Sequence, residues 1–271
     1  GDFKKFSIAT TFNVLIATTL LYPLSLFFEI IGVAISRLIG VFSLAFFYVQ
    51  PIVKHNDGFK VDLSIKDFNF SVIFLANISL FILLLARFIS GLNGSSDITY
   101  FNYSFVLLNI LLTSVIFNIN TIVLRKMSLN KDLKFLFYSL LLSAIFSFLL
   151  YVFVNKFSVS IIDFIYNRGA FNDNDVISTA YFLRSLTPAY IILIFTSVIF
   201  QPFFSLGVDK ISKISLKFSL FLIVVLALLL FYFVLNSIAI KEASFLFVNI
   251  MSIASLLISI LSVRYFLLYE N

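Results

Sequence analysis

The sequence predicts an all-α integral membrane protein with eight transmembrane helices, and three observations lead to this fold class. Of the 271 residues, 61% are hydrophobic and only 12% are charged, and the mean hydropathy is +1.10. Soluble domains are usually about 45–50% apolar and about 25% charged, so this chain has too little charge to cover a globular surface. Finally, the apolar residues gather in eight long runs rather than in the short alternating segments of a transmembrane barrel.

The eight runs hold 16 to 27 residues each, and a helix that crosses a bilayer needs about 20. The second run reaches full length only if it begins near Ile30 and includes Arg37. The sixth run is expected to begin near Val176 and to include Arg184. In chain order the runs are 6–28, 38–53, 68–86, 98–124, 135–155, 185–208, 218–240 and 243–263.

The distribution of Lys and Arg predicts the orientation of the spans. With eight spans, the connecting segments alternate between two sides, and one side carries 13 Lys and Arg while the other carries 3. Cytoplasmic loops of membrane proteins are enriched in these residues, so both ends of this segment are expected in the cytoplasm. The formal charge of +6 then follows from topology, and no nucleic-acid partner is expected.

Two connecting segments carry more than turn residues. Residues 54–67 mix three acids, three Lys and a Gly, which predicts a cytoplasmic linker between a bundle formed by 1–53 and another formed by 68–271. Residues 157–167 place apolar side chains at helical spacing among polar ones, which predicts a short helix lying in the outer membrane interface.

Catalytic and metal-binding constellations are missing from the sequence. The chain has no Cys and a single His, His55, which is expected to be a solvated loop residue. No His or Lys base lies within a span, and no Gly-rich phosphate loop is present. The sequence therefore predicts a protein that is not an enzyme and has no metal or cofactor, with any coupling ion left open.

Three Arg residues within the predicted spans are candidates for substrate binding: Arg37, Arg87 and Arg184. A charge at membrane depth costs at least about 2.5–3.5 kcal/mol and usually faces a bundle interior or water. All three lie in the outer half of the predicted bilayer, where they either snorkel to lipid phosphates or line a cationic cavity for an anionic substrate. Pro188, inside the sixth span, should bend its helix, as a gate or as a static kink.

The most specific local pattern is residues 168–175, RGAFNDND, just before the sixth span. Asn172 is expected to cap this helix, with Asp175 three residues later completing a capping box. This pattern, with FFSLG at 203–207 followed by a Lys-containing turn, resembles the MurJ (MviN) family. These are lipid II flippases within the superfamily of multidrug, oligosaccharidyl-lipid and polysaccharide exporters. The motif residues carried over are Arg168, Gly169, Ala170, Phe171 and Asp175.

The resemblance implies two six-helix lobes, of which this chain supplies a part. Residues 1–53 would be the last two helices of the N-terminal lobe and 68–271 the whole C-terminal lobe, so we expect the chain to be a segment of a longer protein. It further implies a bacterial plasma (inner) membrane protein that moves a polyprenyl-diphosphate-linked glycan precursor for peptidoglycan synthesis. Its expected partners are membrane lipid and this lipid-linked diphosphate.

The chain also departs from the family pattern. Where the family has an Arg in its eighth helix this chain has Val106, and where the family has an acid near the end of its seventh helix this chain has Ala86. Two alternative functions therefore stand beside lipid II transport. One is export of an O-antigen or capsular lipid-linked oligosaccharide, and the other is a membrane scaffold that transports nothing.

Overall fold

The structure of the chain is a computed structural model that divides into two compact units, Gly1–Ile65 and Lys66–Asn271. It describes residues 69–92, 96–111, 116–130, 133–167, 171–206, 208–236 and 238–270, together with helical positions 12–13, 15–20, 23–24, 27–28, 32, 35–36 and 38–43. No strand occurs among these residues, so the predicted all-α class is confirmed for them. The predicted linker at 54–67 and the candidate Arg37 lie outside the described residues.

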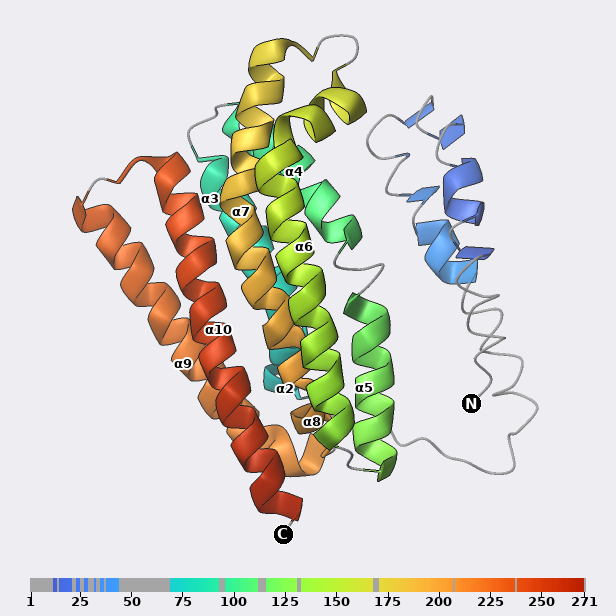
Figure 1. The fold of residues 1–271 in the computed structure, drawn as a ribbon, viewed down its shortest axis with the longest axis vertical. Helices are drawn as coiled ribbons and strands as arrows, with labels where there is room; N and C mark the ends of the chain where they lie inside the picture. The colour runs from blue at the N-terminus through green and yellow to red at the C-terminus, as the bar shows by residue number, and fades with distance from the viewer. Residues whose placement is uncertain are drawn as a thin grey trace. The chain divides into compact units, whose positions relative to one another are not determined.

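The second unit is a bundle of helices drawn in Figure 1. Their bounds are α2 Phe70–Ala76, α3 Ile78–Ser90, α4 Asp97–Leu111, α5 Phe117–Asn130, α6 Leu133–Tyr166, α7 Asp173–Ile199, α8 Gln201–Phe204, α9 Val208–Asn236 and α10 Ile240–Glu270.

Four segments of this unit are long and apolar enough to cross a membrane: Leu133–Tyr166, Asp173–Phe204, Ile211–Asn236 and Glu242–Leu268. A fifth crossing is possible if α2 and α3, which meet at an angle of 75°, count as one broken span. The predicted single span at 98–124 is instead two helices, α4 and α5, of 15 and 14 residues. The described residues thus give four or five crossings, and the number eight stays a prediction.

The bend between α2 and α3 lies at Asn77. Its backbone, with φ −110° and ψ 18°, leaves the helical conformation, and its N–H donates to the carbonyls of Ile73 and Phe74. Its side-chain Nδ2 donates to the same Ile73 oxygen at 2.9 Å. These bonds satisfy two of the last four carbonyls of α2, which helps the helix to end inside an apolar stretch.

The predicted interfacial helix at 157–167 is wrong in one respect, because α6 is a single helix of 34 residues. Residues 157–166 are its last turns rather than a separate element. Lys156 and Asp163 are the only charged residues from 135 to 166, and no Gly or Pro interrupts this stretch, so nothing in the sequence ends the helix before Asn167.

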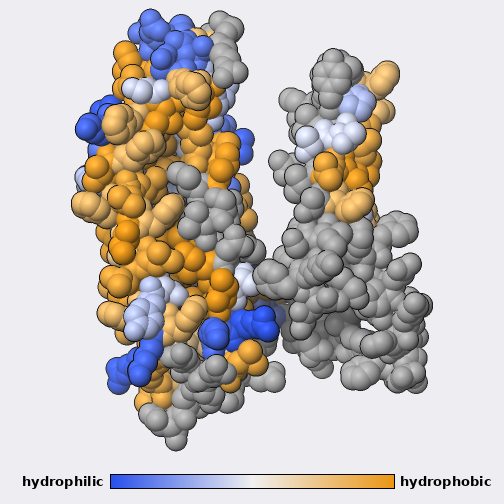
Figure 2. All heavy atoms as spheres, turned by 45° about the vertical axis from the view of Figure 1, so that its right-hand side comes forward, coloured by the Kyte–Doolittle hydropathy of each residue, from blue (hydrophilic) through white to orange (hydrophobic). Residues whose placement is uncertain are grey.

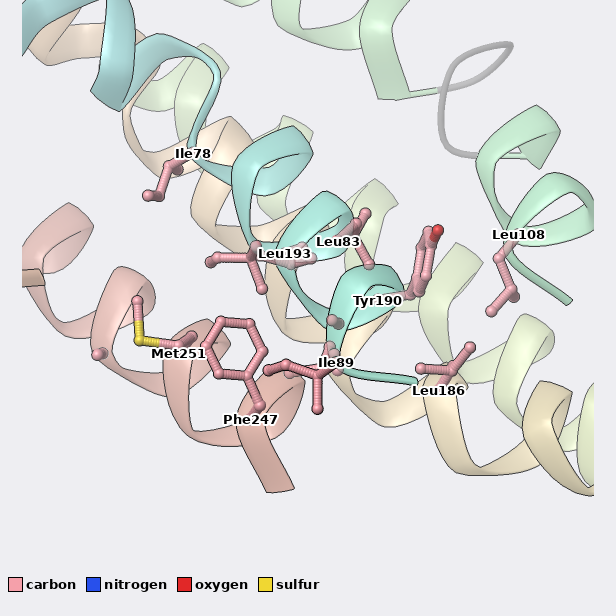
Figure 3. Packing of buried hydrophobic residues seen from close by; sticks show 14 of the residues in the cluster. Ile78, Leu83, Ile89, Leu108, Leu186, Tyr190, Leu193, Phe247 and Met251 are labelled. Carbon is pink, nitrogen blue, oxygen red and sulfur yellow. The ribbon is translucent and has the colours of Figure 1, made fainter. Parts of the chain in front are cut away.

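Helix α7 is the centre of the second unit. It packs against α4, α6 and α10, and α10 also packs against α3. In the apolar part of α7, 56% of the residues are buried, against 28% for α6 and 22% for the part of α9 that could span. Figure 3 shows side chains from these helices meeting in one core, including Leu83, Tyr190 and Phe247.

The outer surface of this unit is apolar around its middle. Phe148 near the middle of α6 is 67% exposed and Ile223 near the middle of α9 is 51% exposed, and many other large apolar side chains are exposed in the same way. Figure 2 shows hydrophobic residues over the middle of the larger body and hydrophilic residues toward its ends. A soluble protein rarely exposes so much contiguous apolar surface, so this surface is suited to contact with lipid.

The first unit contains a close helix contact built on small residues. Gly32, Ser36 and Gly40 are buried at four-residue spacing, which places them on one helix face. A Cβ added at Gly40 would lie 2.9 Å from the Cβ of Ala17 and 2.6 Å from Oδ1 of Asn13. The two backbones therefore approach too closely for any larger residue, as is common where membrane helices pack through small side chains.

Candidate functional site

The start of α7 has the predicted capping box. Oδ1 of Asn172 accepts from the backbone N–H groups of Asn174, at 2.9 Å, and Asp175, at 3.2 Å. In return, a carboxylate oxygen of Asp175 accepts from the N–H of Asn172 at 3.0 Å. The capping role of Asn172 is confirmed, and the acids of the first turn lie where the helix dipole favours negative charge.

Asp175 also joins α7 to α4. The hydroxyl of Tyr100 donates to its other oxygen at 2.7 Å, over a separation of 75 residues along the chain. Four residues further along both helices, Ser104 donates to the carbonyl of Thr179 at 2.9 Å. Asp175, singled out by the family motif, is thus a structural residue that fixes α4 against the first turns of α7.

Phe171 belongs to an aromatic cluster at the same end of the bundle. Its ring lies 5.3 Å from Tyr103 of α4 and 6.0 Å from Tyr166 at the end of α6, and the two tyrosine rings are 4.5 Å apart. The hydroxyl of Tyr166 also donates to the carbonyl of Tyr103 at 3.4 Å. Phe171 therefore ties three helices together where the chain turns from α6 into α7. The motif residues Arg168, Gly169 and Ala170 lie outside the described part of the chain.

Arg184 lies on α7, eleven residues after its first residue, which is about 16 Å along the helix axis. Its side chain is exposed, and its Nε donates to the hydroxyl of Ser158 on α6, which is fully buried. Among the described residues this is its one partner, so no carboxylate neutralises the guanidinium. The charge is held in position by a neutral group and keeps its capacity to bind an anion.

Pro188 follows one turn after Arg184, and α7 continues through it as a single helix to Ile199. Because proline has no N–H, the carbonyl of Arg184 loses its usual partner four residues ahead. The neighbouring hydroxyl of Thr187 donates to the carbonyl of Leu183 at 2.6 Å and not to that of Arg184, so it does not replace the missing bond. The gating role of Pro188 stays a prediction.

Arg87 is not brought to the same place. It is an exposed residue in the last turn of α3, where a cation interacts favourably with the carbonyl end of the helix. Among the described residues no contact or common partner joins Arg87 to Arg184, so the structure does not bring these two candidates together. Its position at a helix end agrees with the simpler snorkelling interpretation.

An apolar groove lies between α4, α6 and α7, next to Arg184. Its volume is about 240 Å³, and every side chain that lines it is apolar. Ser158, the partner of Arg184, is one turn from two lining residues of α6, Val154 and Ile161, and Leu183 lines the groove from α7. The main lining residues are Leu107, Leu108, Ile110, Phe153, Ile165 and Leu183. A cationic group and a hydrocarbon-sized groove therefore lie side by side.

Sequence reasoning did not identify the groove, Ser158 or the tyrosine contacts. Ser158 does belong to a visible pattern, because α6 places buried Ser139, Ser143, Ser147 and Ser158 on one face. Small residues on one face allow helices in membranes to approach closely. No group of three His, Cys, Asp or Glu in the described segments could hold a metal ion.

Comparisons with protein-family models, with curated proteins and with solved structures give no match to this chain.

Proposed function

We propose that the chain is part of a flippase that moves a polyprenyl-diphosphate-linked glycan precursor, similar to lipid II, from the cytoplasmic to the outer leaflet of a bacterial plasma membrane. In this proposal the eight predicted spans belong to two lobes that alternate in access to the two sides. The resemblance at residues 168–175 and 203–207 gives the substrate class. Arg37, Arg87 and Arg184 are the proposed cations of the path.

The observation that carries the proposal is the environment of Arg184. An Arg about 16 Å from the start of a membrane helix is costly unless it has a partner or a function, and its one partner within the described part of the chain is the neutral Ser158. The planar guanidinium donates two parallel hydrogen bonds to phosphate oxygens, which suits it to a diphosphate. The adjacent apolar groove suits the hydrocarbon part of the same molecule.

The test is outer-leaflet accessibility of a labelled precursor in cells that carry the full-length gene, with expression matched between variants. We expect Arg184→Ala to abolish flipping. Arg184→Lys should impair flipping despite its charge, because an ammonium loses both the Ser158 bond from Nε and the two-pronged contact with phosphate. Normal flipping by Arg184→Ala would reject the role of this residue, and equal activity of the Lys variant would support snorkelling.

A second candidate function is a scaffold that transports nothing. The contacts of Asp175 and Phe171 favour it, because both motif residues are engaged in packing α7 against its neighbours rather than left free for a ligand. In that case Arg184→Ala would leave precursor distribution unchanged, while loss of the whole protein would still disturb its partners. The same flipping assay therefore separates the two candidates.

A further inference from the structure

We infer that the groove between α4, α6 and α7 binds the isoprenoid chain of the transported lipid, and that Arg184, which lies beside the groove, binds its phosphate. This inference rests on the proposed function and adds a binding site to it. It assigns the occupant by chemistry: a long hydrocarbon chain that carries an anionic phosphate at one end.

The shape and lining of the groove fit a chain rather than a polar ligand. All its lining residues are apolar, and its volume of about 240 Å³ exceeds the roughly 150 Å³ cavity that is enough to bind benzene. The groove therefore holds a segment of a chain and not a whole lipid. A sugar or a free ion would find no hydrogen-bonding side chain on its walls.

The groove is open to the surface of the bundle. Ile110 of α4 is 56% exposed and Phe153 of α6 is 53% exposed, although both line it. The buried Leu183 and Leu108 form its floor. A chain can therefore enter sideways from a bilayer without any separation of α4 from α6.

The positive charge of Arg184 beside the groove favours a lipid with an anionic head group. Leu183, on the floor, directly precedes Arg184, and Ser158 holds the Arg184 Nε at the level of the groove between Val154 and Ile161. Because the described residues offer this guanidinium no carboxylate, an anionic head beside the chain is its complement. A lipid without net charge would fill the groove but leave the cation unpaired.

The chain contains no Trp, so a single Trp introduced into it reports on the surroundings of that one position. Phe153→Trp places the reporter in the lining, and Phe148→Trp, at a 67% exposed position of the same helix, is the matched control. Both variants are reconstituted in phosphatidylcholine with brominated chains, which quench Trp on contact. Unlabelled polyprenyl phosphate is then added, with unlabelled phosphatidylglycerol as the competing anionic lipid.

We expect polyprenyl phosphate to relieve the quenching at residue 153 and not at residue 148. Adding Arg184→Gln to the reporter should weaken the apparent affinity about fivefold, as expected for one cation near an anionic head, whereas Arg264→Gln on the exposed surface of α10 should not. Arg184→Lys, which keeps a cation, should lie in between. This variant provides a second measurement if the Gln variant folds poorly.

Equal relief at residues 153 and 148 would overturn the inference, and so would relief of equal size by phosphatidylglycerol, because the groove would then be a site for bilayer lipid. The assay measures binding without transport, so the two proposals can fail separately. If polyprenyl phosphate does not enter the groove while Arg184→Ala still abolishes flipping, only the chain site is wrong. If it enters the groove while Arg184→Ala flips normally, only the role of Arg184 in transport is wrong.

Discussion

Replacing Asn172 with Ala tests whether the capping box holds the start of α7. The substitution removes one oxygen that accepts two backbone N–H groups, at 2.9 Å and 3.2 Å. Loss of such a cap costs about 1 kcal/mol, within a range of about 0.5–2. The bond from the N–H of residue 172 to Asp175 survives in the Ala variant, since it comes from the backbone, so we expect the middle of this range rather than its upper end.

Hydrogen exchange of the peptide that begins at residue 172 measures this cost directly. A loss of about 1 kcal/mol raises the population of the open first turn about fivefold. The exchange of the Val176 amide, whose bond to the backbone carbonyl of residue 172 remains in the variant, should rise by the same factor. Asn172→Ser keeps an acceptor and should exchange as the native chain does. Asn174→Ala is the matched control, because its side chain is exposed and lies outside the box.

Equal exchange in Asn172→Ala and Asn174→Ala would refute the capping argument. It would mean that packing against α4 and α6, and not the local bonds, holds the first turn. A slowing of exchange in Asn172→Ala would refute it as well, since no capping contact can be gained by removing the amide.

Three further predictions follow from packing and topology. Gly40→Leu should lower the thermal stability of the first unit in detergent, because even a Cβ has no space there; an unchanged midpoint would contradict the close helix approach. Phe171→Leu should lower the stability of the fold by about 0.5–1.5 kcal/mol more than the loss of buried apolar area alone, because it removes the ring contacts. Phe164→Leu, at an 81% exposed position, should not lower it measurably, and equal melting temperatures of the two variants would count against the aromatic cluster. Single Cys residues at Ser96 and Ser128 of this Cys-free chain should react with an impermeant reagent from opposite sides, and labelling from one side would show that α4 and α5 do not cross together.

The features that the sequence predicted correctly depend on neighbouring residues. Helical class follows from continuous apolar runs, and the capping box follows from Asn172 and Asp175 at a spacing of three, which brings them together in any helix. Local spacing also failed in places. The run at 98–124 is continuous in hydropathy yet forms two helices, and α6 continues where a polar edge predicted a separate element.

The features that could not be predicted depend on which helices pack together. Arg184 meets Ser158 across 26 residues, and Asp175 meets Tyr100 across 75, so neither contact has a signature in local sequence. The groove needs side chains from three helices at once, each of them an ordinary apolar residue in its own helix. A sequence shows that Arg184 is costly in a membrane, but only the packing of α6 against α7 shows what lies beside it.

The interface of α6 and α7 has features that would let the two helices shift against each other without unfolding. The buried Ser residues of α6 have small side chains, and within the described residues the hydroxyls of Ser143 and Ser147 make no hydrogen bond that would have to break if the helices slid. On the α7 side, Pro188 leaves the carbonyl of Arg184 without its usual bond, so the helix is least constrained where the cation lies. The Ser158 bond is the one polar contact of Arg184 with α6, and a phosphate that binds the guanidinium more strongly than a neutral hydroxyl does would compete with it. Under the proposed function, anion binding by Arg184 would therefore act on the packing of α6 against α7 through this one side chain.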